Sequence, residues 1–186
     1  MEDLIAEFGG YRLFVFPDDD AENPRRGADN ACRIVLWRDL AEYGDRVVAP
    51  QDLAEEWARE GVPPVAYTLV ADGEGGLMMA DAVSDIASGP GDGVVYVTEA
   101  DLRKRLGAKA EASWAPSWAE DTMEAEVFAL SQWLCGEVYC YCIVKGDCEL
   151  VTMRGGYLYH RSAVDDGELV LGELLWADEQ KHAKGG

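Results

Sequence analysis

Carboxylates are the most numerous side chains in this sequence that could do chemistry, and one loop concentrates them. Asp18, Asp19 and Asp20 follow one another directly, and Glu22 comes two residues later. Three successive aspartates repel each other, so this loop has to be solvated or has to meet cations. We therefore interpret it either as a solvated loop or as a surface that receives a cationic partner.

Two features limit the interpretation of this loop. A calcium-binding loop alternates its oxygen ligands, turns at a glycine and ends in a distal glutamate, and that pattern is missing here. Arg25 and Arg26 follow the acids closely in the sequence. We expect these two arginines to neutralise part of the loop's charge.

A second group of acids comes at the start of a predicted helix. Ser117 and Glu120 have the spacing of a capping box, in which the two side chains cap the helix start reciprocally. Apolar residues then recur at helical spacing up to Gly136, which predicts the helix end. Asp121 and Glu124 add negative charge to the first turns, where the helix dipole favours it.

Four cysteines lie near the end of this helix and in the strand predicted after it. They are Cys135, Cys140, Cys142 and Cys148, and the chain has five cysteines in all. Their spacing matches no zinc module. An odd number of cysteines without a secretory signal favours reduced thiols. We interpret them as small core residues, with metal binding as the alternative.

The sequence contains no recognised catalytic motif. His160 and His182 have no serine or cysteine partner at a known spacing. Neither a dinucleotide fingerprint nor a phosphate-binding loop is present. No pair of glycosidase-type acids can be singled out among 36 acids. We therefore expect a non-enzymatic protein without catalytic residues, metal or cofactor; a hydrolase with an unrecognised carboxylate site is the enzymatic alternative.

The elements that would position these residues alternate between short strands and helices. The strands are predicted over 11–16, 32–37, 65–71, 77–80, 94–97, 138–144 and 148–153, and the helices over 50–60, 98–107, 117–136 and 169–184. Hairpins predominate, and no parallel crossover unit repeats. This predicts an α+β fold, with a mostly antiparallel sheet and helices packed on one face, in a single domain of residues 1–186.

Two details of the C-terminal region follow from the same reasoning. Asp165, Asp166 and Gly167 are predicted to form a turn before the last helix. The docking face of that helix is predicted to consist of Leu171, Leu174, Leu175 and Trp176.

The net charge is the most unusual property of the sequence. Thirty-six acids against 16 bases give a formal charge of −20, and the acids are spread along the whole chain. Because 48% of the residues are hydrophobic, we expect a folded domain with an acidic surface, not a disordered acidic tail. There is no apolar run near the ~20 residues that a membrane span needs. The acidic N-terminus lacks the basic region of a signal peptide, so we expect a cytoplasmic protein.

An acidic surface of this kind predicts a cationic partner. B-DNA carries about one negative charge per 1.7 Å of its axis, and proteins that hold it present Arg and Lys channels. A rigid domain with carboxylates at similar density can occupy such a channel. We therefore expect a basic DNA-binding protein or complex as the partner, and no direct binding of nucleic acid. The alternative is that the charge only keeps the protein soluble.

Four short segments resemble a group of small acidic proteins of phages and mobile elements. The segments are Pro17-Asp-Asp-Asp-Ala-Glu-Asn-Pro-Arg25, Asp29-Asn30 with Ile34-Val-Leu-Trp37, Gly93-Val-Val-Tyr-Val-Thr98 and Gly136-Glu-Val-Tyr139. The likeness covers residues from about 11 to about 155. Cys140 departs from it, since that group has glycine there, and so does Thr152-Met-Arg-Gly-Gly-Tyr157, where the group has Cys-Trp-Gly-Phe-Tyr.

The resemblance implies an anti-defence role, because its phage context and the acidic charge are similar to those of anti-CRISPR inhibitors that imitate DNA. On this hypothesis the protein blocks the DNA channel of a CRISPR surveillance or nuclease complex in the host cytoplasm. The residues expected to bind the partner are Asp18, Asp19, Asp20, Glu22, Glu120, Asp121 and Glu124. The alternative is an acidic regulatory protein that binds a partner without imitating DNA.

Overall fold

The computed structural model describes residues 3–27, 29–146 and 149–184, and it divides the chain into two compact units. The smaller unit combines the two ends of the chain, Met1–Glu22 and Gly136–Gly186. The larger unit is the continuous segment Asn23–Cys135. Each unit has its own four-stranded antiparallel sheet, where the sequence analysis expected one sheet.

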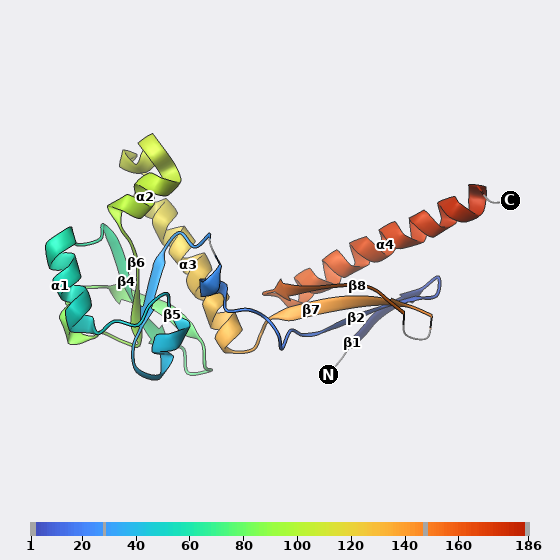
Figure 1. The fold of residues 1–186 in the computed structure, drawn as a ribbon, viewed down its shortest axis with the longest axis horizontal. Coiled ribbons are helices and arrows are strands. Elements are labelled where there is room, and N and C mark those ends of the chain that lie inside the picture. The colour runs from blue at the N-terminus through green and yellow to red at the C-terminus, as the bar shows by residue number, and fades with distance from the viewer. Residues whose placement is uncertain (1–2, 28, 147–148, 185–186) are drawn as a thin grey trace. The chain divides into compact units, whose positions relative to one another are not determined.

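The smaller unit consists of one sheet and one long helix (Figure 1). Its strand order is β1 (Asp3–Phe8), β2 (Tyr11–Pro17), β7 (Tyr139–Lys145) and β8 (Glu149–Tyr157), and all pairs are antiparallel. The helix α4 (His160–Lys184) follows β8 and runs along one face of the sheet. β7 has a neighbour on each side, so it is a central strand of this sheet.

The core of the smaller unit lies between this sheet and α4. Every second residue of β2 is buried there, namely Tyr11, Leu13 and Val15. Tyr141 and Ile143 of β7 are buried on the same side. Because successive side chains of a strand point to opposite faces, the residues in between face away from α4.

Two aspartates of α4 anchor the helix to the sheet. Near the C-terminal end of α4, Asp178 accepts hydrogen bonds from the Tyr11 hydroxyl at 2.8 Å and the Lys145 ammonium at 2.6 Å. The bonds from Lys145 and Tyr11 lower the pKa of Asp178 to about 2. A carboxylate that accepts such bonds is stabilised in its charged form.

The second anchor corrects the predicted turn at 165–167, since α4 begins at His160 and includes these residues. Asp166 accepts from the hydroxyls of Tyr157 at 2.6 Å and Tyr141 at 3.0 Å, and these bonds lower its pKa. Gly167 leaves room for the Leu13 side chain, because a Cβ at this position would come within 2.7 Å of a Leu13 methyl group. The glycine that suggested a turn instead allows α4 to approach the sheet closely.

The larger unit is built on a second sheet, with the strand order β3 (Arg33–Leu36), β6 (Gly93–Val97), β4 (Val65–Ala71) and β5 (Leu77–Ala82). All its pairs are antiparallel, and every residue of β6 is buried. The predicted α+β class with antiparallel pairing is therefore confirmed in both units.

Helices cover both faces of the larger unit's sheet (Figure 1). On one face, α3 (Ala115–Leu134) buries Met123 and Val127. On the other, α1 (Pro50–Glu60), which has the bounds predicted from the sequence, buries Leu53 and Trp57. Adjacent residues of β3 point to opposite faces of the sheet. Leu36 therefore packs in the core cluster with α3, and Val35 packs in the core cluster with α1.

A third helix, α2 (Glu99–Leu106), follows β6 in the larger unit. It is capped reciprocally by Thr98 and Asp101, which confirms the predicted start of this helix.

Some predicted element boundaries are wrong. α3 begins at Ala115, not at Ser117, and places Pro116 in its first turn, where proline is tolerated. The strand β1 was not predicted, because the sequence there reads as acidic. Trp176, predicted to dock α4, is 64% exposed.

In the part of the chain that the structure describes, no helix is long and apolar enough to cross a bilayer.

We predict that the attachment of α4 to its sheet weakens in acid. The pKa of Asp178 is about 2 in the folded state, below the ~3.9 of a free aspartate. Its contribution to stability is therefore fully present above about pH 4 and is lost as the pH falls towards 2. Asp178→Asn is expected to lower the urea midpoint of the smaller unit at pH 7 and to leave it unchanged near pH 2.

Hydrogen exchange of the α4 amides during urea titration measures this midpoint. Glu173→Gln is the matched control, because Glu173 is an exposed acid on the same helix. The anchor hypothesis is wrong if both variants show the same dependence on pH.

Candidate partner-binding surface

The first acid of the predicted loop has a structural role. The carboxylate of Asp18 accepts the backbone N–H of Gly156 at 3.0 Å, and the Asp18 N–H donates to the Val138 carbonyl at 2.8 Å. A Cβ at the neighbouring Gly155 would lie only 2.2 Å from Oδ2 of Asp18. Asp18 therefore ties the end of β2 to β8, and the glycine pair makes room for its carboxylate.

The other three acids of the loop are available to a partner. Asp19, Asp20 and Glu22 are exposed. None of them has an ion pair within the residues that the structure describes. Arg25 does not neutralise them as expected, because its guanidinium binds Asp45 and Glu126.

The second group of acids lies on the exposed side of α3. Glu120, Asp121 and Glu124 are all exposed, and they span about 6 Å along the helix axis. The Tyr67 hydroxyl donates to Glu120 at 2.8 Å, which raises the pKa of Tyr67. Asp121 and Glu124 have no ion pair among the described residues. Met123 and Val127, which follow two of these acids at i+3 spacing, are buried, so the packed edge of the same helix holds the acids in place.

The seven predicted residues divide into two sets. Asp18 to Glu22 belong to the smaller unit, and Glu120 to Glu124 belong to the larger unit. The smaller unit contains 16 acids and 6 bases, and the larger unit contains 20 acids and 10 bases. Each unit therefore has a formal charge of −10, so the surplus of acids is divided equally between them.

A buried ion network holds α3 in place in the larger unit. The Arg25 side chain is 1% exposed and pairs with Asp45 at 2.8 Å and with Glu126 of α3 at 2.5 Å. It also donates to the Cys32 carbonyl at 2.8 Å. These bonds together raise the pKa of Arg25, although burial alone would lower it. The Arg25 guanidinium therefore keeps its positive charge although it is buried.

Glu126 links this network to the start of β3. It accepts the Ala31 N–H at 2.6 Å and the Cys32 thiol at 2.9 Å. Burial and the Glu126 charge raise the pKa of Cys32, so this thiol stays protonated and unreactive. Sequence reasoning missed the network because the partners of Arg25 lie 20 and 101 residues away.

Most other cations with a described partner also bind acids of their own unit. The shortest of these pairs are Arg33–Asp101, Arg46–Glu56, Lys145–Asp178 and Arg161–Asp165. The basic cluster near 103–105 behaves similarly, since Arg103 pairs with Glu99 and Arg105 donates to the Asp29 carbonyl. These paired cations are thus committed within the fold, and many of the remaining carboxylates are exposed.

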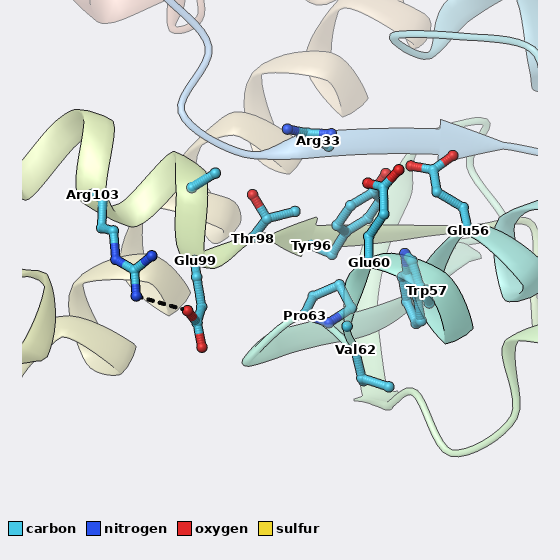
Figure 2. A pocket seen from close by; sticks show the side chains of 12 residues that line it. Arg33, Glu56, Trp57, Glu60, Val62, Pro63, Tyr96, Thr98, Glu99 and Arg103 are labelled. Carbon is cyan, nitrogen blue, oxygen red and sulfur yellow. Dashed lines mark hydrogen bonds and ion pairs between the residues drawn. The ribbon is translucent and has the colours of Figure 1, made fainter.

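A cavity of about 360 Å³ between α1 and α2 is one place where an unrecognised hydrolytic site could lie. Figure 2 shows Glu56 and Glu60 at one end and Glu99 with Arg103 at the other. A general acid at neutral pH needs a raised pKa. Glu56 has the opposite shift, because hydrogen bonds from Arg46 lower its pKa. The geometry therefore offers no argument for a carboxylate-dependent hydrolase at this cavity.

The cysteines form no metal site within the described residues, where no group of three or more His, Cys, Asp or Glu side chains could hold an ion. Cys140 is buried in β7 and Cys142 is half-buried. Cys135 is exposed and belongs to the larger unit. Cys148 lies outside the described residues.

We predict that the buried network is the most sensitive polar feature of the larger unit. Arg25→Ala leaves the partly buried carboxylates of Asp45 and Glu126 without their cation, which should cost about 3 kcal/mol of unfolding free energy. Arg25→Lys should recover only part of this loss, since an ammonium cannot reproduce the planar fork. Urea denaturation measures the free energy of unfolding.

Arg26→Ala is the control for this prediction, because Arg26 is adjacent and exposed, with one bond to the Glu42 carbonyl. It should change stability by no more than about 0.5 kcal/mol. Equal losses in Arg25→Ala and Arg26→Ala would show that the network does not stabilise the unit.

Comparisons with protein-family models, with curated proteins and with solved structures found no match to this chain.

Proposed function

We propose that this protein is a non-enzymatic inhibitor of the anti-CRISPR type, which presents carboxylates in place of DNA phosphates to the DNA-binding channel of a CRISPR surveillance or nuclease complex. The proposal depends on one observation, namely that several exposed acids have no cationic side chain paired with them among the described residues. Asp19, Asp20 and Glu22 in one unit, and Asp121 and Glu124 in the other, have no ion pair within the described residues.

The chemistry of these acids matches a channel that holds phosphates. A cation-lined groove binds negative charge with little regard to the group that carries it, and both surfaces release counterions on contact. The acids on α3 are held by a packed core and by the Glu126–Arg25 pair, so their spacing is fixed before binding. A preorganised array loses less conformational entropy on binding than a flexible acidic tail.

The equal charge of −10 on each unit supports a partner with an extended basic surface. Charge of one sign speeds the approach of a cationic partner and makes the association rate depend strongly on salt. The resemblance to acidic phage proteins supports the same class of partner.

We predict that removing the α3 acids weakens binding more than removing other acids does. Glu120→Gln, Asp121→Asn and Glu124→Gln together should slow association with a purified Cascade-type complex about tenfold at low salt and reduce its salt dependence. Asp52→Asn, Glu55→Gln and Asp81→Asn remove the same charge from other exposed positions of the larger unit and should have a smaller effect. Surface plasmon resonance at several salt concentrations measures both.

Competition with target DNA then separates mimicry from other modes of binding. Mimicry requires that the protein and the DNA exclude each other from the complex. If both bind together without mutual loss, the protein is an acidic partner-binding protein that does not imitate DNA. If the two triple variants bind equally weakly, total charge and not the position of the acids determines binding.

A further inference from the structure

The sheet of the smaller unit has a second face, which points away from α4. Side chains that alternate with the buried ones on β2 and β7 point to this side, and the edge strands β1 and β8 add further apolar groups. We call this surface the open face; its apolar members are Leu4, Phe14, Phe16, Cys142, Val144, Leu150 and Met153, and Cys140 on the same side is buried at its corner.

The strand register makes the open face continuous. Leu4 lies opposite Phe14, Phe14 opposite Cys142, and Cys142 opposite Met153, so one apolar row crosses all four strands. In a neighbouring row, Val144 lies opposite Leu150. Side chains directly opposite each other on neighbouring strands are about 5 Å apart and in contact.

The edges of the open face are accessible. Leu4 is 53% exposed, Leu150 59% and Met153 54%. The helix α4 packs on the other side, and on this side the Arg12 guanidinium lies over the Phe14 ring at 5.9 Å. Monomeric proteins rarely expose contiguous apolar patches of more than a few hundred Å², and larger ones mark interaction sites.

The acidic loop lies at one end of the open face. A Cβ at Gly155 would touch both the Asp18 carboxylate and the Cys140 side chain, which places Asp18 beside this corner of the sheet. Burial, together with the charges of Asp18, Asp19 and Asp20, raises the pKa of Cys140 to about 11. The apolar surface and the three aspartates are therefore neighbours within one unit.

We propose that the open face and Asp18 to Asp20 together form a docking surface for a protein that carries an apolar patch beside a cluster of Lys or Arg. This inference rests on the proposed function and names a part of the chain that contacts the partner. Charge complementarity selects a cationic partner, because a second copy would bring like-charged aspartates and another unit of −10 to the same interface.

The variant that tests the surface is Leu150→Thr with Met153→Thr, which removes exposed apolar groups and keeps the strand propensity. The matched control is Leu169→Gln with Trp176→Gln on α4, where the side chains are 63% and 64% exposed. Against a purified Cascade-type complex, the open-face variant should bind about tenfold more weakly, and the control should bind like the wild type. Equal binding by the open-face variant and the wild type would overturn the proposal.

A second experiment does not need that complex. Amide NMR shifts of the full chain are recorded with octyltrimethylammonium, which joins an apolar tail to a cation, and with octyl sulfate as the anionic control. The cationic probe should shift β2, β7, β8 and residues 18–20, and the open-face variant should lose most of this response. Shifts centred elsewhere, or equal shifts with both probes, would overturn the proposal.

The outcomes separate this proposal from the proposed function. If the Cascade-type complex does not bind but the cationic probe maps to the open face, the anti-CRISPR function fails and the docking surface stands. If the complex binds both variants like the wild type, the function stands and the surface is wrong. A dimer in sedimentation velocity that the open-face variant abolishes would identify a second copy as the occupant and overturn the choice of a cationic partner.

Discussion

The shortage of cations is the constraint on which the rest of this structure depends. With 16 bases for 36 acids, the chain cannot neutralise its surface. One cation, Arg25, is buried between the partly buried Asp45 and Glu126, whereas other ion pairs lie at the surface. An unpaired charge in the core costs several kcal/mol, whereas an exposed one is hydrated and screened. The surplus negative charge therefore remains outside, as a consequence of how the core is stabilised.

The two units use their charged groups to stabilise different architectures. In the larger unit, helices cover both faces of the sheet, and the buried Arg25 network joins α3 to the start of β3. In the smaller unit, one helix covers one face, and its two aspartates accept hydrogen bonds from tyrosines and cations of the sheet. The carboxylates that anchor α4 are thus part of the fold, and they differ in kind from the acids left free at the surface.

The acidic loop after β2 combines both roles. Asp18 is tied to β8, while Asp19 and Asp20 are exposed beside it. A run of three aspartates is unfavourable in isolation because of mutual repulsion, and the bond from the Gly156 N–H offsets part of this cost. The loop therefore presents its charge from a fixed point on the sheet, which favours a role in recognition over that of a mobile tail.

The sequence by itself determined the type of most elements, because local patterns record them. The alternation in β2 and β7, the capping pair Thr98 and Asp101, and the apolar spacing in α1 all correspond to observed strands and helices. The acidity and the exposure of Asp19, Asp121 and Glu124 also followed from composition and helical spacing. These features depend on residues close together in the chain, so a single sequence contains the information.

Only the tertiary structure decided which charged groups are structural and which are free. Arg25 looks like the neighbour of an acidic loop, yet its partners come from elsewhere in the chain. Asp166 and Gly167 look like a turn, but a tyrosine pair and a close helix–sheet contact give them another role. The division into two sheets and the open apolar face likewise depend on pairing between distant strands. Such pairings are chosen by packing over the whole unit, which no local pattern encodes.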